Sequence, residues 1–137
     1  MPNVAHYRIG EAARLLGISD DTVRRWVSTN VLTASKDAAG RHVVDGAELA
    51  ARAKEIAVVP DDPSGVESSA RNRFVGLVTE IIADTVMAQV ELQCGPYRVV
   101  SLMSSEAVRD LGLEVGSLAV AVVKSTMVIV ETPGEHT

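Results

Sequence analysis

Two polar stretches interrupt the apolar second half of the sequence, and both carry side chains suited to holding an anion. Ser69 and Arg71 stand just before the run FVGLV, and Lys124 and Ser125 interrupt VVKSTMVIV. Cations supply charge, while hydroxyls and backbone N–H groups supply directional hydrogen bonds, which suits a tetrahedral oxyanion with two charges. An unpaired ammonium between buried strands is costly, so Lys124 needs a partner there. The residues alone therefore predict an anion site, without specifying the anion.

Several polar residues in this half of the sequence, including Ser104, also have a purely structural interpretation. Ser104 precedes a short helix expected at 104–110, so its hydroxyl could cap that helix, while the helix N-terminus could also attract an anion. Lys124 could be a surface lysine whose stem covers apolar groups. Asn72 could fix the entry to the strand, and Arg73 could lie on the surface.

A second group of candidates lies near the N-terminus, in IGEAARLLGISDDTVRRWV, residues 9–27. Apolar residues recur there at helical spacing on either side of Gly17, which predicts two short amphipathic helices. Ser19 can cap the second helix, and Trp26 belongs to its apolar face. The opposite face carries basic and hydroxyl side chains that could contact a DNA groove. These candidate DNA-binding residues are Thr22, Arg24 and Arg25.

Composition limits the function classes. The chain has 137 residues and one cysteine, Cys94, which excludes an intramolecular disulfide and a multi-thiolate metal site within one chain. No apolar run is long enough to span a bilayer and no secretion signal is evident, so we expect a cytoplasmic protein without a membrane partner. The net charge is −5, but residues 1–56 hold eight Lys and Arg against seven Asp and Glu. DNA binding, if present, belongs to that first part.

The hydrophobic pattern changes from helical to strand-like across residues 57–67, which contain Pro60 and Pro63 and are typical of a linker. Before the linker, we expect a helical domain over residues 1–56. After it, five short valine-rich runs, the last being MVIV at 127–130, predict a small β domain over residues 68–137. The expected fold class is α+β, in two domains.

The first part resembles the MerR-like or excisionase-like winged helix-turn-helix. The resemblance rests on IGEAARLLGIS, DTVRRWV and AAGRHVVDGAELAARA. It implies a β-hairpin wing between Leu32 and Val44, with a turn at 37–40, followed by a helix over 46–56 that Asp45 caps with Glu48 in the reciprocal position. Arg41 and His42 would be the wing residues that approach DNA.

The second part resembles the molbindin family, also called the molybdopterin-binding or TOBE domain, through SARN, LMSSEAVRDLGLEVG and AVVKST. The resemblance implies an OB-like five-stranded barrel that binds molybdate or tungstate at a site shared between subunits or repeats. It also implies a homo-oligomer, either a dimer or a hexamer. The oxyanion ligands implied by the resemblance are Ser69, the backbone of Ala70, Arg71, Ser104, Lys124 and Ser125, with no metal other than that of the oxyanion.

These expectations leave two main functions open. The first is a molybdate- or tungstate-responsive transcriptional regulator that binds double-stranded DNA. The second is an oxyanion storage or homeostasis protein whose helix-turn-helix domain serves as a docking module. An OB-type nucleic-acid binder is disfavoured because residues 57–137 are acidic and hold only Phe74 and Tyr97 as aromatics. We expect no enzyme, since no nucleophile–base pair or metal cluster is evident, and the absence of a Walker motif excludes a transporter ATPase.

Overall fold

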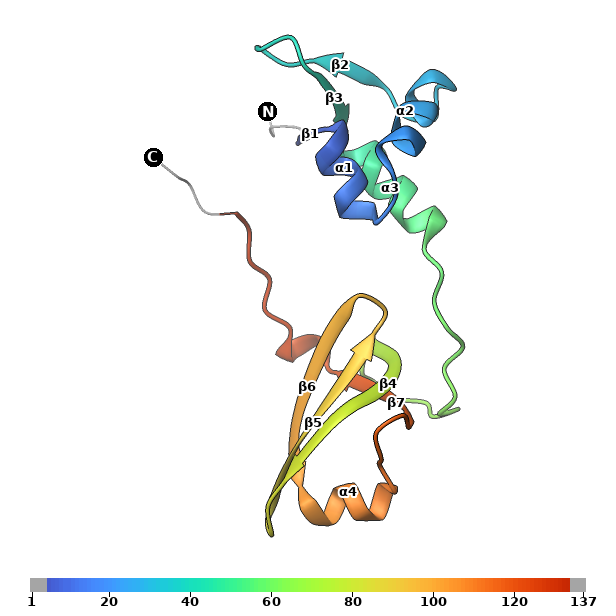
Figure 1. Cartoon of the computed structure of the whole chain (residues 1–137). Helices are drawn as coiled ribbons and strands as arrows, with labels where there is room; N and C mark the ends of the chain where they lie inside the picture. Colours follow the sequence, from blue (N-terminus) through green and yellow to red (C-terminus); the bar gives the residue numbers. More distant parts are fainter. Residues whose placement is uncertain (1–4, 134–137) are drawn as a thin grey trace. The chain divides into compact units, whose positions relative to one another are not determined.

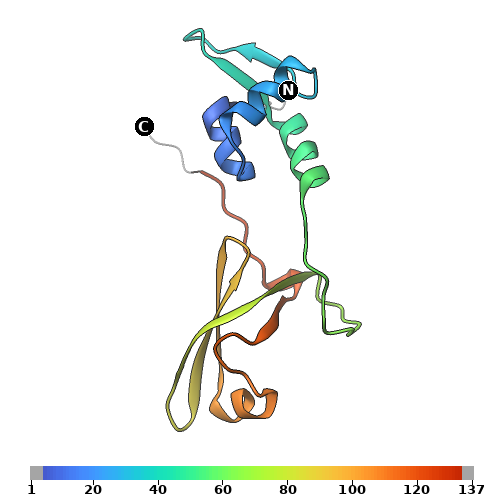
Figure 2. The ribbon, with the colours of Figure 1, turned by 45° about the vertical axis from the view of Figure 1, so that its right-hand side comes forward.

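The structure, a computed structural model, describes residues 5–133 and contains two compact units. The first unit ends at Val59, and the second begins at Pro60. Figures 1 and 2 show that helices dominate the first unit and that a long twisted sheet dominates the second. The predicted mixed α+β class is confirmed, with the helices and the long strands largely in separate units.

Three helices and a small antiparallel sheet make up the first unit. The elements are β1 (His6–Arg8), α1 (Ile9–Leu16), α2 (Asp20–Ser28), β2 (Ala34–Lys36), β3 (His42–Asp45) and α3 (Gly46–Ile56). The sheet has the strand order β1-β3-β2. A two-stranded hairpin therefore follows the second helix, and α3 follows the hairpin.

Local end signals explain the short connection between α1 and α2. Gly17 ends α1 in the left-handed conformation, with a φ of 68°, which is accessible to glycine at little cost. The Ser19 hydroxyl accepts a hydrogen bond from the Thr22 backbone N–H at 3.2 Å and caps α2, as predicted. The two helices can therefore pack against each other over a tight turn.

The core of the first unit lies between these helices and β3. Trp26 is only 7% exposed, and the Arg52 guanidinium of α3 lies 4.6 Å from the centre of its ring. This cation–π contact joins α3 to α2. The buried cluster consists of Ala12, Ala13, Val23, Trp26, Leu32, Val44 and Leu49.

The start of α3 differs in one detail from the sequence prediction. The Asp45 carboxylate caps the helix by accepting from the Glu48 N–H at 3.2 Å, as expected. The predicted reciprocal bond from the Glu48 side chain is wrong, because that carboxylate accepts instead from the Thr33 N–H at 3.1 Å and the Thr33 hydroxyl at 2.9 Å. Thr33 lies before β2, so Glu48 ties the segment after α2 to α3.

Four antiparallel strands and a short helix form the second unit. The elements are β4 (Asn72–Ala83), β5 (Met87–Cys94), β6 (Tyr97–Ser104), α4 (Ser105–Leu111), β7 (Leu118–Val123) and a 3₁₀ helix (Ser125–Met127). The strand order is β6-β5-β4-β7. The long β4 pairs with β7 through its first half and with β5 through its second half, and it changes register at a bulge between Val78 and Glu80.

The second core lies on the concave face of this sheet, beneath α4. Val78, Val90, Leu92 and Cys94 are buried there, and Met103 and Val108 pack against them. Burial raises the pKa of the Cys94 thiol, so it remains a small apolar side chain at neutral pH.

The five-strand count predicted for the barrel is not confirmed. Within residues 5–133 the sheet has four strands, and the expected fifth, at 127–130, does not form. The chain turns through the 3₁₀ helix and then continues without regular structure, leaving Ile129 84% and Val130 83% exposed. Strand propensity alone does not make a strand, because its backbone groups and apolar face both need a partner.

Candidate oxyanion site and DNA-binding surface

The pairing of β4 with β7 brings the two polar stretches of the second unit to the same end of the sheet. Asn72 is the first residue of β4 and is paired with Val123, the last of β7. The Asn72 side-chain amide donates to the Val123 carbonyl at 3.1 Å and fixes this end of the pair. Arg71 and Lys124 are the next residues outward on the two chain segments, so the register brings both cations to this end of the sheet.

The hydroxyl and backbone groups predicted for the site lie in the same two segments. Ser69 and Ser125 are exposed, whereas Ala70 is only 7% exposed. The Ala70 N–H, expected to face the anion, donates to the Ser68 hydroxyl at 3.1 Å. An oxyanion that uses this N–H must therefore share it with Ser68 or replace that hydroxyl.

The burial argument for Lys124 does not hold within a single chain. Lys124 is exposed and precedes the 3₁₀ helix, where its carbonyl accepts from the Met127 N–H at 2.9 Å. Arg71 is exposed as well. Neither side chain makes a hydrogen bond or an ion pair within residues 5–133. Both charges are therefore available to a ligand that comes from outside the chain.

Ser104 is not brought to this end of the sheet. It ends β6 opposite Met87, and its hydroxyl caps α4 by accepting from the Ala107 N–H at 3.0 Å. Figures 1 and 2 show α4 at the opposite end of the sheet from the 3₁₀ helix that follows β7. Of the six predicted oxyanion residues, one chain thus gathers the five that lie in 69–71 and 124–125.

Sequence reasoning missed the role of Arg73, which lies two residues beyond the candidate site. Its Nε donates to Asp62 Oδ2 at 2.6 Å, and its NH2 group donates to the Ser64 hydroxyl at 2.7 Å. The hydrogen bond from Arg73, followed by those from Ser64, holds the pKa of Asp62 far below its usual range. The only available signal was the linker sequence PDDPS, which by itself indicates a turn.

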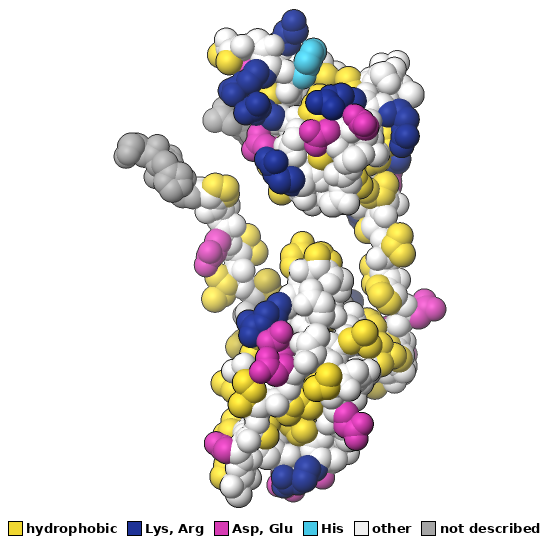
Figure 3. Space-filling view, in the orientation of Figure 1, with side chains coloured by type: hydrophobic (Ala, Val, Ile, Leu, Met, Phe, Trp, Pro, Cys, Tyr) yellow, Lys and Arg dark blue, Asp and Glu magenta, His cyan; other side chains and the backbone are white. Residues whose placement is uncertain are grey.

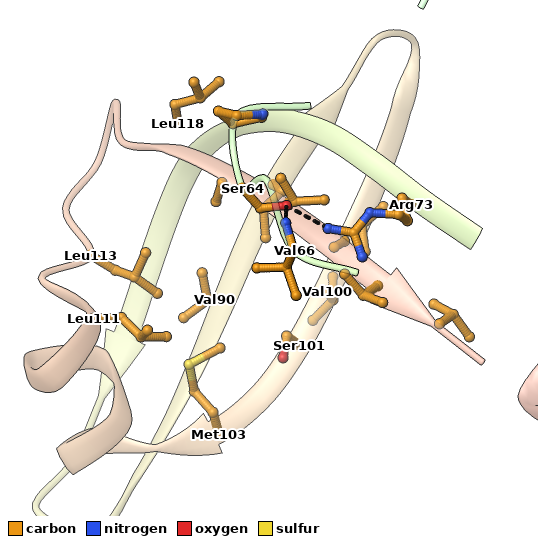
Figure 4. A pocket seen from close by; sticks show the side chains of 18 of the residues that line it. Ser64, Val66, Arg73, Val90, Val100, Ser101, Met103, Leu111, Leu113 and Leu118 are labelled. Carbon is orange, nitrogen blue, oxygen red and sulfur yellow. Dashed lines mark hydrogen bonds between the residues drawn. The ribbon is translucent and has the colours of Figure 1, made fainter. Parts of the chain in front are cut away.

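Ser64 and Arg73 also line a cavity of about 810 Å³ in the second unit. Figure 4 shows Ser64 and Val66 of the linker above it and Val90, Met103, Leu111 and Leu113 around it. Part of the predicted linker therefore packs on the second unit.

The residues proposed for DNA contact lie on two elements of the first unit. On α2, Arg24 and Arg25 are exposed, and the Thr22 hydroxyl lies 2.9 Å from that of Ser19. Arg24 has a loose, exposed contact with Asp21, at 3.4 Å. Most Lys and Arg side chains in the face seen in Figure 3 lie on this unit.

The hairpin residue Arg41 is held by Asp37. One oxygen of the Asp37 carboxylate accepts from the Ala39 and Arg41 N–H groups, both at 2.9 Å, and the other accepts from Arg41 Nε at 3.2 Å. The bond from the Arg41 N–H is the main reason that the pKa of Asp37 is lowered. His42 pairs with Lys36 across the hairpin and is exposed. Asp37 thus shapes the turn and orients Arg41.

Two negative observations concern residues 5–133 alone. In that range, no three His, Cys, Asp or Glu side chains are placed to hold a metal ion. No helix in the same range is long and apolar enough to cross a bilayer.

The structure thus has a unit with two helices joined by a tight turn and followed by a hairpin, and a small β unit that carries a candidate anion site. Comparison with known families agrees, since residues 7–56 match a helix-turn-helix domain and residues 68–130 match the TOBE domain. The chain belongs to the TOBE-domain, or molbindin, family, in which it carries an additional helix-turn-helix domain.

Individual relatives support this assignment for the second unit. Molybdenum-pterin-binding protein 3 of Clostridium pasteurianum is 38% identical over 63 residues, which make up 45% of this chain and 93% of that protein. A probable molybdenum-pterin-binding protein of Haemophilus influenzae is 43% identical over 63 residues, covering 45% and 91% of the two chains. The molybdenum transport protein ModE of Herbaspirillum seropedicae is 35% identical over 68 residues, or 49% of this chain and only 25% of its own length. None of these names describes an enzyme.

Among solved structures, a molybdate-binding protein from Sporomusa ovata matches with a TM-score of 0.47 and 31% identity, over 49% of this chain and all of that one. The cytoplasmic molybdate-binding protein ModG matches with a TM-score of 0.44 and 31% identity, over 63% of this chain and 72% of its own.

Proposed function

We propose that the protein is a molybdate- or tungstate-responsive transcriptional regulator, with the oxyanion bound by the second unit and double-stranded DNA bound by the first. The observation that carries the proposal is the β4–β7 register, which brings the segments that carry Arg71 and Lys124 to the same end of the sheet, within a TOBE domain. Two exposed cations without partners in residues 5–133 match the charge of a dianion. The names of the molybdenum-binding relatives support the choice of anion.

The oxyanion site is completed between chains in this proposal. Ser104 lies at the far end of the sheet from Lys124, so the hydroxyl opening α4 reaches the site only from a second copy. Ser69, Ser125 and the Ala70 N–H supply the directional donors from the first copy. The protein is accordingly a homo-oligomer, a dimer or a hexamer, assembled through its β unit.

DNA binding follows the general geometry of a winged helix-turn-helix. The N-terminal half of α2 enters the major groove, where Thr22, Arg24 and Arg25 meet base edges and phosphates. The β2–β3 hairpin acts as the wing, and Arg41 and His42 approach the backbone beside the groove. Oligomerisation through the β unit supplies the two DNA-binding units that a two-fold symmetric operator requires. We place the protein in the cytoplasm, where such an operator lies and where ModG is described.

The test is native mass spectrometry of the full chain with molybdate, tungstate or sulfate, followed by gel shifts on DNA from upstream of its own gene. We expect an oligomer that retains molybdate or tungstate but not sulfate, and a DNA affinity that changes when the oxyanion is added. An oligomer that binds the oxyanion but no DNA would favour the storage alternative. A chain that retains no oxyanion would contradict both.

A further inference from the structure

The linker between the two units is fastened to the second unit at one point. Asp62 and Ser64 both bond to Arg73, which lies on β4, and the Ser64 N–H and hydroxyl also donate to Asp62 Oδ1 at 2.9 and 2.6 Å. These three residues, which we call the clip, form a closed set of hydrogen bonds. Arg73 and Asp62 are partly shielded, with 23% and 33% of their side chains exposed.

The clip closes a loop that contains the candidate oxyanion residues. The loop leaves at Asp62 and returns at Arg73, so Ser69, Ala70 and Arg71 lie inside it. The Ala70 N–H, one of the proposed anion donors, is already held by Ser68 within the same loop. An oxyanion that binds these residues therefore orders a segment whose two ends the clip holds together.

The clip also sets the length of chain that connects the two units. Helix α3 ends at Ile56, and the sheet begins at Asn72. If the intervening chain were free, it could span up to about 55 Å at full extension, whereas the stretch from Ile56 to Asp62 spans at most about 20 Å. Closing the clip therefore restricts how far each DNA-binding unit can move from the β unit to which it is joined.

We infer that the clip formed by Asp62, Ser64 and Arg73 is the element that couples the oxyanion site to the DNA-binding unit. The inference rests on the proposed function and adds its regulation. Oxyanion binding and clip closure order the same loop, so each favours the other, and coupling of this kind needs no new fold. Asp62 and Arg73 are positioning residues, since they bond to each other and leave Arg71 to the anion. The closed clip shortens the free chain between each DNA-binding unit and its β unit, so the DNA-binding units of an oligomer can reach fewer separations.

The first test compares the full-length wild type with Asp62→Asn and with Asp61→Asn. The Asp61 change is the matched control. It also removes one negative charge from the linker, but the Asp61 carboxylate makes no bond in the clip. Calorimetry with sodium molybdate should show affinity lowered by about tenfold in Asp62→Asn, within the usual range of coupling between sites, and unchanged in Asp61→Asn. Asp62→Glu should recover part of the loss. Equal molybdate affinity in the wild type and Asp62→Asn would overturn the inference.

The second test is amide hydrogen exchange across residues 57–73, with and without sodium molybdate. In the wild type, molybdate should slow exchange at residues 62–66 as well as at 69–71. In Asp62→Asn, protection at 62–66 should be lost even when molybdate is saturating, a result that a general loss of stability would not confine to the linker. If the wild type binds molybdate and residues 62–66 do not respond, the clip is not coupled and only this inference fails. If the wild type binds no molybdate, the proposed function fails and the inference with it.

Discussion

Some polar side chains of the second unit have hydrogen-bond or ion-pair partners within residues 5–133, and others do not. The Ser105 hydroxyl donates to the Asp84 carbonyl at 2.7 Å, and Arg98 contacts Glu91 at 2.8 Å. Arg71 and Lys124 have no such partners within residues 5–133. Arg71 and Lys124 differ from other exposed cations because the strand register brings both to one end of the sheet, which makes them candidates for binding an anion.

Replacing either cation should weaken oxyanion binding. A hydrogen bond to a charged group contributes roughly 1.5–3 kcal/mol, so Arg71→Ala and Lys124→Ala should each lower molybdate affinity by at least about tenfold. Arg109→Ala, on the exposed side of α4, is the control and should have no effect. Calorimetry with molybdate measures all three, and wild-type affinity in both site variants would disprove the assignment.

At the scale of elements, the buried face of α2 holds Val23 and Trp26, and its exposed face is the one we propose for DNA contact. Arg25 makes no side-chain bond within the described part of the chain, whereas Arg24 is in contact with Asp21. We therefore expect Arg25→Ala to weaken DNA binding and to lower the salt slope of the binding constant by about one unit. Lys54→Ala, in the last turn of α3, should leave both unchanged, and molybdate affinity should not change in either variant. Gel shifts at several salt concentrations measure the affinity and its salt dependence. An unaltered salt slope in Arg25→Ala would contradict the proposed contact between α2 and DNA.

A second element-scale prediction concerns the close approach of β4 to the end of β5 at Gly76. A Cβ added at Gly76 would collide with the Gln93 carbonyl and lie 2.6 Å from Cys94 Sγ. The neighbouring backbone cannot yield easily, so Gly76→Ala should destabilise the second unit by about 1–3 kcal/mol. Gly10→Ala, in α1, is the contrast, because its nearest neighbour would be 3.9 Å away and alanine favours helix by roughly 0.5–1 kcal/mol. Denaturant unfolding of both variants measures these changes. A free energy of unfolding equal to that of the wild type in Gly76→Ala would show that β4 and β5 can move apart at Gly76 at little cost.

The elements that the sequence predicts well are those with complete local signals. Helix α3 lies where Asp45 and the linker prolines place it, and α4 covers Ser105–Leu111, close to the predicted 104–110. The fifth strand was predicted from the apolar run MVIV and from the family resemblance, but a strand also depends on a partner. The oxyanion stretches were recognised from their residue types, but the distance between Ser104 and Lys124 depends on the strand register. The clip was missed because Asp62 and Arg73 are eleven residues apart and a polar linker gives no sign of such a contact.

At the scale of the whole molecule, the second unit leaves much apolar surface uncovered. Leu102 on β6 is 71% exposed and Leu118 on β7 is 57% exposed, and these two strands form the edges of the sheet. Small domains bury a limited fraction of their surface and gain stability by association. In the described part of the first unit, α3 ends at Ile56 and is followed by Pro60 and Pro63, so it does not continue as a long helix that could pair with a second copy.

Assembly should depend on the segment after the 3₁₀ helix. Ile129 and Val130 are 84% and 83% exposed and extend beyond β7, where a second copy can supply the strand partner that one chain lacks. We expect the wild type to sediment as a dimer or larger species at tens of micromolar, and the double variant Ile129→Asp/Val130→Asp to be monomeric at about the same concentration, because charges at these positions cannot be buried without partners. The matched control is Val58→Asp/Val59→Asp, which alters linker valines that are 93% and 74% exposed and should leave the oligomer intact.

Since the proposed oxyanion site needs two copies, molybdate should also raise the oligomer fraction of the wild type on dilution. Analytical ultracentrifugation distinguishes these outcomes: a monomeric wild type in the presence of molybdate would refute both the assembly and the shared site, and an unchanged oligomer in the 129/130 variant would place the interface elsewhere on the sheet.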